Sequence, residues 1–524
     1  MTHLPTSWAQ VTVEALASDE PASITDGPFG SNLKTSHYTE DGPRVIRLQN
    51  IGDGVFVDES AHVSEEHFDR LRRHEAVAGD VVIAMLGEKL PRACVVPPYV
   101  GPAIVKADCV RLRVHPRLSM APYVTHALNS QQLRTQAQAL VHGVGRPRLG
   151  LKWLRTLAVP LAPRPEQHRI VEAIESYFSR LDDAVATLER VQRNLKRYRA
   201  SVLKAAVEGR LVPTEAELAR AEGRDYEPAS VLLERILAER RRRWEEAELA
   251  KMMAKGKTPK DDKWKAKYKE PATPNTIDLS ELPDGWCWAA VEQLGFIASG
   301  QTPKGVTTAG AQQGDVPWFR VGDMNADANQ FQMTVATEWL TTAQVAALGL
   351  HVRPTGTIIF PKRGGAIGTN KKRVLGRPAA YDLNTMGVVP VGDARSYLWV
   401  WFLGVDLGSL ADGSNVPQIN HGDIAPLPVP LPPAAEQDRI VNEVNANLSI
   451  ADDVTAAVTA NRLRSGRLRQ SILKWAFEGR LVDQDPTDEP ASRLLERIRA
   501  ERESKLAKTS RTRRRARATM TGRT

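Results

Sequence analysis

A basic, glycine-rich segment in the second half of the chain has the composition of a phosphate-binding surface. No aspartate or glutamate occurs between Glu338 and Asp382, and six Lys or Arg residues lie within 362–377, among several glycines. Guanidinium and ammonium groups donate hydrogen bonds to phosphate oxygens, and Arg and Asn also pair with guanine and adenine edges. The alternative is a solvated basic loop without a partner. The predicted nucleic-acid contacts in this segment are Lys362, Arg363, Asn370, Lys371, Lys372 and Arg373.

Further residues able to contact nucleic acid are scattered over both halves of the chain. In residues 1–160, 17 basic side chains face 16 acidic ones, so charge alone marks no surface there. For any one of these residues, a plain surface role is as frequent as a contact. The candidates are Lys34, Arg47, Gln49, Asn50, Lys89, Arg92, Arg146 and Arg148 in the first half, and Lys304, Arg320, Asn415 and Gln418 in the second.

Two short loops occupy equivalent places late in each half of the chain. Residues 143–147 read GVGRP and residues 413–417 read GSNVP, and each loop precedes a strand punctuated by prolines. Glycine, asparagine and proline are typical turn residues. The equivalence favours a shared structural turn over a shared contact.

The sequence predicts no catalytic, cofactor-binding or metal site. Pro97-Pro98-Tyr99 resembles part of an adenine methyltransferase motif, but Val96 stands where Asn or Asp must bond the flipped base. The glycine-rich segment at 364–371 does not fit the spacing of a phosphate-binding loop. The three cysteines form no CxxC pair, and the eleven histidines lack metal-ligand spacing.

The elements that would position these residues are organised by a repeat. Residues 160–212 align with 430–482 without a gap, and 23 of the 53 positions are identical. Both copies end in EGRLV, and a helix-like block that begins with EPAS follows each, from Glu227 and from Glu489. Two blocks repeated in the same order indicate one shared structural task.

Each copy of the repeat predicts a long amphipathic helix. In the first copy, apolar residues recur from Ile170 to Val202 in nine steps over 32 positions, close to a helical period. Gly209 follows as a helix cap. The apolar stripe of this helix needs a partner, and the second copy is the obvious one. That copy has a weaker stripe, which includes Leu468, and we expect a kink at Gly466.

The stretches of about 150 residues before each helix share only an outline. Both open with Leu-Pro, at Leu4 and Leu282, and both have a Trp shortly after. Each contains a β-like run after a glycine, at Val81–Ile83 and at Ile358–Phe360, and each ends in a proline-punctuated strand. The residues between these anchors differ freely. This pattern is typical of two recognition modules that share a scaffold and differ in surface.

The net charge of +9 says little about the folded domains. Residues 234–270 and 499–524 carry net charges of +5 and +8, so the remainder of the chain is slightly acidic. No signal peptide or membrane span is predicted, and the few cysteines fit a reducing cytoplasm.

The repeat resembles the conserved regions of type I restriction-modification specificity (S) subunits. The resemblance rests on PLxPxxEQxRIV leading into a long helix and then EGRLV, in both copies. The segment Asp26–Lys34 (DGPFGSNLK) also resembles the opening of many target-recognition domains in this family. Together these features cover about residues 4–503.

The resemblance implies a mixed α/β (α+β) fold with a pseudo-two-fold internal repeat. Two globular target-recognition domains would be separated by two long helices packed as an antiparallel coiled coil. The implied divisions are target-recognition domain 1 (1–163), helical region 1 (164–240), a basic linker (241–279), target-recognition domain 2 (280–433), helical region 2 (434–503) and a basic disordered tail (504–524).

The resemblance also implies partners and a division of chemistry. Each domain would read one half of a split, asymmetric site on double-stranded DNA. Two methyltransferase (M) subunits would dock on the helices and hold S-adenosylmethionine, and restriction (R) subunits would add ATP and Mg. This chain would be a non-catalytic, cytoplasmic subunit. The alternatives are a coiled-coil assembly adaptor that does not read DNA, and a fused nuclease or methyltransferase.

Overall fold

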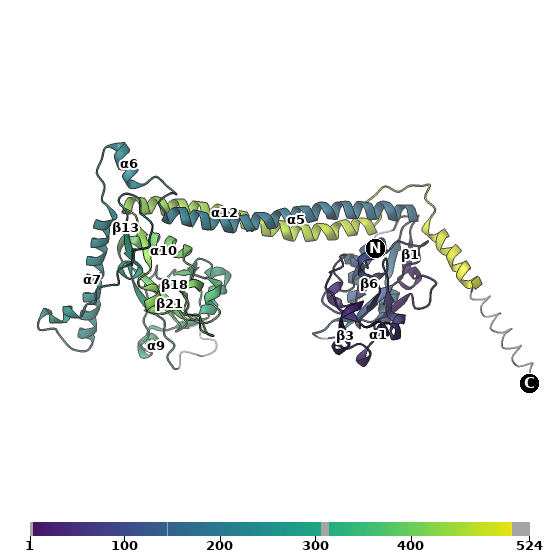
Figure 1. Ribbon diagram of the computed structural model, residues 1–524, viewed down its shortest axis with the longest axis horizontal. Helices are drawn as coiled ribbons and strands as arrows, with labels where there is room; N and C mark the ends of the chain where they lie inside the picture. Colours follow the sequence, from purple (N-terminus) through teal and green to yellow (C-terminus); the bar gives the residue numbers. More distant parts are fainter. Residues whose placement is uncertain (1–3, 144, 305–313, 506–524) are drawn as a thin grey trace, which may run out of the picture. The chain divides into compact units, whose positions relative to one another are not determined.

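The computed structural model describes residues 4–143, 145–304 and 314–505, which form two compact units. Unit 1 comprises Met1–Arg190 and Val458–Thr524, and unit 2 comprises Val191–Ala457. Each unit holds a domain of mixed helices and strands together with segments of the two long helices, α5 (Arg164–Val207) and α12 (Ala434–Phe477) (Figure 1). The predicted mixed α/β class is confirmed. The predicted tail lies outside the described residues from 506 onward.

The domain of unit 1, here called domain 1, is built on two four-stranded sheets. Their strand orders are β2-β9-β6-β7 and β4-β3-β8-β5. Strand β6 is buried on both faces, because Val81 and Ile83 enter one apolar core while Val82 and Ala84 enter another. The elements are β1 (Ala9–Thr12), β2 (Ile24–Asp26), β3 (Tyr38–Ile46), β4 (His62–Val63), α1 (Glu65–Arg70), β5 (Glu75–Ala76), β6 (Val81–Ala84), β7 (Arg92–Val95), β8 (Ala103–Val105), β9 (Cys109–Leu112), α2 (Ala121–Asn129), α3 (Gln131–Gln138), β10 (Val141–His142), β11 (Arg148–Leu149), α4 (Leu151–Thr156) and β12 (Ala158–Leu161).

The domain of unit 2, domain 2, follows the same plan with a five-stranded and a three-stranded sheet. Their strand orders are β14-β21-β18-β19-β16 and β17-β15-β20. Strand β18 repeats the alternation of β6, with Ile358 and Phe360 in one core and Ile359 in another. The elements are α6 (Glu215–Glu222), α7 (Ala229–Ala254), β13 (Cys287–Ala290), α8 (Val291–Leu294), β14 (Gly295–Ser299), β15 (Val316–Phe319), β16 (Gln332–Met333), β17 (Glu338–Leu340), α9 (Thr342–Ala347), β18 (Ile358–Pro361), β19 (Arg373–Leu375), β20 (Ala380–Tyr381), β21 (Thr385–Pro390), α10 (Arg395–Gly404), α11 (His421–Ile424) and β22 (Pro428–Leu431).

A two-stranded antiparallel sheet joins the first and last strands of each domain. In domain 1, β1 pairs with β12, and Ala9 lies opposite Leu161. In domain 2, β13 pairs with β22, and Cys287 lies opposite Leu431. The chain therefore leaves each domain beside the point where it entered.

The long helices pair in antiparallel orientation within each unit. In unit 1, Arg469 of α12 pairs with Asp182 of α5, and Arg462 pairs with Glu189. A step of seven residues toward the C-terminus of α5 therefore corresponds to a step of seven residues toward the N-terminus of α12, as antiparallel packing requires. In unit 2, Arg199 of α5 lies 2.6 Å from Asp452 of α12.

The charge distribution along the two helices favours this orientation. No acidic residue occurs in 190–207 of α5 or in 454–477 of α12, whereas the first half of each helix carries several. Antiparallel packing places each basic half beside an acidic half, while parallel packing in register would place like charges together. Each exposed ion pair contributes at most about 1 kcal/mol, so the orientation reflects several pairs acting with the apolar seam.

The seam between the helices differs in part from the predicted stripe. Val458 and Ile472 are buried as expected, but Leu468 is 41% exposed and the small side chain of Ser465 is buried instead. The described helix also runs without interruption through Gly466, where we had expected a kink. Small residues at the seam let the helices approach closely, and arginines flank it.

The end of the first repeat copy packs against domain 2, and the end of the second copy packs against domain 1. Gly209, at the end of the first copy, adopts φ +66° and lies against Pro283 of domain 2, so a Cβ there would overlap the proline ring. Gly479 lies in the same way against Pro5 of domain 1. The duplicated EGRLV motif therefore secures the start of each domain.

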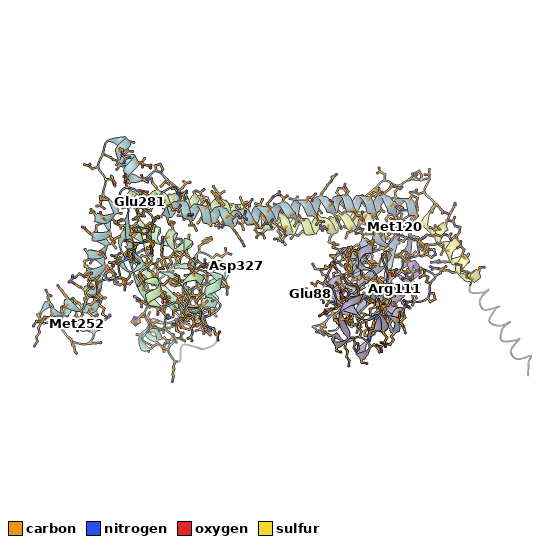
Figure 2. All side chains as sticks on the ribbon, viewed as in Figure 1. Glu88, Arg111, Met120, Met252, Glu281 and Asp327 are labelled. Atoms are coloured by element: carbon orange, nitrogen blue, oxygen red, sulfur yellow. The ribbon has the colours of Figure 1, made fainter. Side chains whose placement is uncertain are left out.

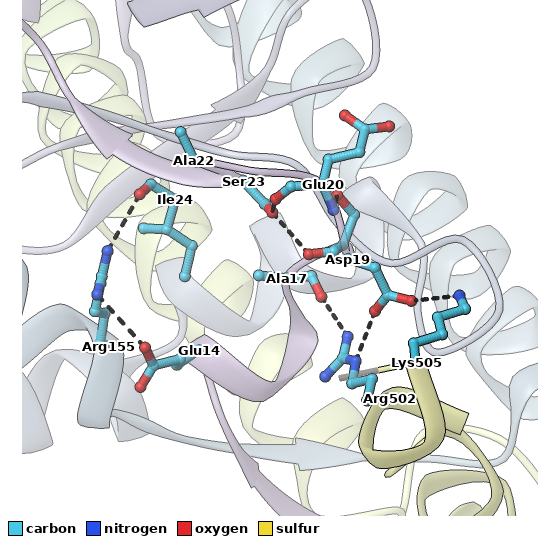
Figure 3. Close-up of a pocket in the computed structure, with 11 residues that line it drawn as sticks. Glu14, Ala17, Asp19, Glu20, Ala22, Ser23, Ile24, Arg155, Arg502 and Lys505 are labelled. Atoms are coloured by element: carbon cyan, nitrogen blue, oxygen red, sulfur yellow. Dashed lines mark hydrogen bonds and ion pairs between the residues drawn. The ribbon is translucent and has the colours of Figure 1, made fainter. Parts of the chain in front are cut away.

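The helix-like block after each repeat secures the same domains. Ala229 N donates to Gly285 O at 2.8 Å in unit 2, and Ala491 N donates to Ser7 O at 2.9 Å in unit 1. The helix of residues 491–505 carries Arg502, which donates to Ala17 O at 2.6 Å and to Asp19 at 2.7 Å (Figure 3).

Candidate nucleic-acid interface

Three loops meet at one surface of domain 2. Gly364 N donates to Pro417 O at 2.7 Å, and Ile419 N donates to Lys362 O at 2.9 Å. The Lys362 ammonium donates to Ser299 Oγ at 3.2 Å. These bonds hold segments 299–304, 362–370 and 412–418 together.

Domain 1 assembles three loops with equivalent main-chain bonds. Gly87 N donates to Pro147 O at 3.1 Å, and Leu149 N donates to Met85 O at 2.9 Å. The guanidinium of Arg148 lies over the ring of Phe29, 5.1 Å from its centroid. Segments 26–34, 86–91 and 143–148 are thereby joined. We call these sets of three segments the three-loop surfaces of the two domains.

One glycine holds the first loop of each surface against the sheet. Gly27 N donates to Cys109 O at 3.0 Å, and Gly300 N donates to Thr385 O at 2.9 Å. A Cβ at Gly27 would overlap the backbone of Lys106, and a Cβ at Gly300 would overlap that of Asp382. Both positions therefore need glycine for the same steric reason, and the predicted shared turn extends to a shared three-loop frame.

Ten of the eighteen candidate residues lie in the segments of these two surfaces, and one of them, Asn370, accepts from Leu407 N at 2.9 Å. Arg148 forms an ion pair with Asp108 at 2.8 Å, Lys362 bonds Ser299, and the Gln418 amide donates to Asn420 at 2.7 Å. The other six have exposed side chains with no hydrogen-bond or ion-pair partner among the described residues, so they are available to a ligand. These six are Lys34, Lys89 and Arg146 in domain 1 and Lys304, Arg363 and Asn415 in domain 2. Figure 2 labels Glu88, next to Lys89, on domain 1.

Several other candidates hold their own domain together. Asn50 is 1% exposed, and its amide accepts from Arg47 N at 2.8 Å and donates to Val57 O at 2.9 Å. Arg92 and Arg373, at equivalent places on β7 and β19, donate to main-chain oxygens of Leu48 and Met324. The Arg47 guanidinium donates to Glu59 O at 3.3 Å. These bonds give the four candidates structural roles.

Lys372 is the least accessible of the predicted contacts. It is 5% exposed, and its ammonium donates to Val405 O. Burial lowers the pKa of Lys372 to about 8. Asn370 accepts from Leu407 N at 2.9 Å and so fixes the turn that sends Lys372 inward.

Three further candidates lie at the surface but have polar partners within their domain. Lys371 donates to Asn325, and Arg320 pairs with Glu338 while stacking on Trp318. The Gln49 amide donates to Glu59 at 2.6 Å. Nucleic-acid contact by any of the eighteen residues stays a prediction.

The remaining surfaces of the described residues supply no metal site. No cluster of three or more His, Cys, Asp or Glu side chains in this part of the chain could hold a metal ion. A cavity of about 440 Å³ in unit 1 is lined by Glu14, Asp19 and Glu20 (Figure 3). Arg155 pairs with Glu14 and Arg502 pairs with Asp19, so the cavity marks the attachment of the 491–505 helix. Among the described helices, none has the length and apolar character to cross a bilayer.

Sequence reasoning overlooked the part of α12 that borders the loops of domain 1. A groove of about 840 Å³ in unit 1 is lined by Gly87, Lys89 and Gly143 on one side and by Gly466 and Arg467 on the other. The absence of acidic residues from the second half of each helix was the sequence signal for this basic surface.

Comparison with known proteins gives a consistent result along the chain. No family model matches it. It is 22% identical to the type I restriction enzyme EcoKI specificity subunit of Escherichia coli strain K12, over 95% of this chain and 96% of that protein. It is 23% identical to the EcoBI specificity subunit of Escherichia coli, over 95% and 92%. It is also 23% identical to the StySPI specificity subunit of Salmonella potsdam, over 95% and 96%.

The fold is also found among solved structures. One example comes from a study of complex assembly and conformational transition of the type I R-M system. The match has a TM-score of 0.58 and 18% identity, and it covers 91% of this chain and 99% of that chain.

The fold and the internal repeat define a class of duplicated mixed α/β proteins. In this class two long paired helices carry two domains that share a strand arrangement but differ in their surface residues. Together with the sequence likeness over nearly the whole chain, the fold and the repeat confirm the resemblance noted above. Over nearly its whole length the chain is similar to the specificity subunits of type I restriction enzymes.

Proposed function

We propose that this chain is the DNA sequence-specificity subunit of a type I restriction-modification complex, in which each domain reads one half of a bipartite, asymmetric site. The observation that carries the proposal is the pair of three-loop surfaces. They share their main-chain bonds, and their exposed side chains differ. A common frame with different donors is what two half-sites of different sequence require.

The available side chains suit both kinds of DNA contact. Arg363 and Asn415 lie on adjacent loops of domain 2. An arginine can bond guanine through two acceptors in the major groove, and an asparagine can bond adenine through a donor and an acceptor. Lys89 and Arg146 occupy the corresponding loops of domain 1, while Lys34 and Lys304 have the chemistry for phosphate.

The chemistry of the complex would belong to partner subunits. Two methyltransferase subunits would bind the paired helices and hold S-adenosylmethionine. Restriction subunits, where the system has them, would bind ATP and Mg. This chain itself would catalyse nothing and hold no cofactor, and it would act in the cytoplasm, where the DNA is.

The proposal is tested by co-expressing the chain with its partner methyltransferase subunit and mapping methylated adenines across the host genome. We expect a two-part, asymmetric motif with a fixed gap. A palindromic one-part motif, or no methylation, would contradict the proposal.

Matched double variants assign each half of the motif to a domain. R363A/N415A removes exposed donors from domain 2, and K89A/R146A removes them from domain 1. Each good paired contact contributes about 1–3 kcal/mol to discrimination between bases. We therefore expect each variant to relax one half of the motif and preserve the other. Relaxation of both halves by either variant would show that the domains do not read separately.

A further inference from the structure

We infer that the long helices themselves bind DNA, through a strip of arginines that contacts the phosphate backbone beside each three-loop surface. This inference rests on the proposed function and extends the DNA-binding surface from the loops to the helices. In unit 1 the strip consists of Arg464 and Arg467 of α12. In unit 2 it consists of Arg193, Lys196 and Arg197 of α5.

The arginines of α12 divide into two kinds. Arg462 and Arg469 form ion pairs with Glu189 and Asp182 of α5 and so belong to the helix pair. Arg464 and Arg467 are exposed, and the described residues supply no hydrogen-bond or ion-pair partner for either. Long cations that the fold does not use are available to an anionic ligand.

Arg467 lines the groove that separates α12 from the loops of domain 1. Lys89, on the opposite wall, belongs to the three-loop surface and is likewise exposed and without a partner among the described residues. Of the two carboxylates in the lining, Asp53 is paired with Arg134 at 2.8 Å, which leaves Glu88. The available charge in the groove is therefore positive and continuous with the loops.

Gly466 gives a ligand room to approach the helix. Glycine inside a helix costs about 1 kcal/mol relative to alanine, yet apart from the adjacent backbone of α12 no described atom lies within 4 Å of the place where its Cβ would be. The packing of the described residues does not require glycine here. A DNA backbone passing close to the helix would benefit from the missing side chain.

The same arrangement occurs independently in unit 2. Arg467 corresponds to Arg197 in the repeat, and both positions are arginine. Arg193, Lys196 and Arg197 are exposed on the α5 face that also contains Ala200, and the described residues supply no hydrogen-bond or ion-pair partner for them. Ala200 lines a groove of about 500 Å³ whose other wall includes Asn370 of the basic segment. In unit 2 the three basic residues thus lie on the turns of α5 next to the groove, whereas in unit 1 Arg467 lines the groove itself.

Double-stranded DNA is the occupant that the charge favours. Its phosphates are closely and regularly spaced, and a row of Lys and Arg one helical turn apart can contact several of them without reading sequence. Contacts of this kind would hold the duplex against the helix while the loops read bases.

The test measures DNA affinity of the complex assembled with its methyltransferase subunits, as a function of salt concentration. The probes are a duplex that carries the mapped motif and a duplex of equal length with both half-sites scrambled. R467A and R197A are compared with R180A, which removes the same charge from an exposed position of α5 outside the strip. R467K retains the charge.

Each lost phosphate contact should lower the slope of log affinity against log salt by about one. We expect this change in R467A and in R197A, with equal loss of affinity for both duplexes and an unchanged motif. R467K and R180A should keep the wild-type slope. Wild-type slopes in R467A and R197A would overturn the inference, and so would a drop of the same size in R180A.

A different experimental result would refute the proposed function. If the wild-type complex does not prefer the motif duplex over the scrambled one, sequence reading itself is refuted. If it does prefer that duplex while the helix variants keep its slope, only the helix contact is refuted. Size-exclusion chromatography of each variant complex separates loss of assembly from loss of DNA contact.

Discussion

Domains 1 and 2 fold the same frame around loops of different length and chemistry. The loop between β6 and β7 spans seven residues, 85–91, whereas the loop between β18 and β19 spans eleven, 362–372. Both loops nevertheless form the same two main-chain bonds with the late loop, through Gly87 in one domain and Gly364 in the other. Because main-chain groups carry the frame, side chains and loop length are free to vary without disturbing it.

The largest expected effect comes from the tryptophan that joins each domain to its helix. Trp286 donates to the buried carboxylate of Glu436 at 3.0 Å, and Trp8 donates to Glu166 at the same distance. W286A removes a large buried ring and one partner of a buried acid, at a cost of about 3–5 kcal/mol. Hydrogen exchange should show lost protection in β13 and β22 but not in β1 and β12.

The reciprocal variant sharpens the comparison. W8A should expose β1 and β12 and spare β13 and β22. A phenylalanine at either position keeps most of the packing and should cost only about 1–2 kcal/mol. Equal loss of protection in both units from a single variant would show that the two domains are not independently stabilised.

A smaller effect should distinguish the two arginines that end the EPAS blocks. Arg240 has a 7% exposed side chain and donates to Glu292 O at 2.8 Å and to the Tyr268 hydroxyl at 2.9 Å. R240A leaves buried groups without partners and should cost about 2–3 kcal/mol. Arg502 is more exposed, so R502A should cost only about 1 kcal/mol. Urea denaturation of both variants measures the difference, and a larger loss in R502A would contradict the expectation from burial.

A comparably small effect is a rise in the free energy of unfolding with pH in domain 2. Burial lowers the pKa of Lys372 from 10.5 to about 8. Between these values the unfolded chain binds more protons than the folded chain, so the free energy of unfolding rises with pH. Relative to K372M, the wild type should gain about 1–2 kcal/mol between pH 8 and 9.5. Denaturation followed by a probe in domain 2 measures the gain.

Domain 1 should show the opposite tendency. Burial raises the pKa of Cys94 and of Cys109 to about 12, so above pH 9 their thiols ionise more readily in the unfolded chain. Stability of domain 1 should therefore fall as pH rises above 9. A gain that persists in K372M would assign the pH dependence of domain 2 to another group.

The sequence was sufficient to predict the mixed α/β class, the two long helices and the shared plan of the domains, because periodicity and duplication are encoded locally. Side-chain direction inside the basic segment was not predictable. Arg363 and Lys372 have the same chemistry and lie in one acid-free stretch, yet one is exposed and the other is buried. The difference depends on a turn at Asn370, with φ +52°, and on the position of Val405, which belongs to a distant segment.

The helix seam shows the same limit. Leu468 fits a helical period, but Ser465 occupies the buried position, since the register against α5 is set by long-range pairs such as Arg469 with Asp182. Charge asymmetry along each helix could have predicted that register, because the halves without acidic residues are readable from the sequence alone.

The pairing of the first and last strands of each domain also affects how a gene for this fold can change by recombination. Because β1 lies against β12, and β13 against β22, the residues between each pair begin and end at neighbouring points. A gene segment encoding 13–157 or 291–427 could be exchanged for another of any length without moving the helices. The duplicated stretches beside those segments offer matching DNA for recombination, so a lineage could acquire a new half-site in one event and keep the other.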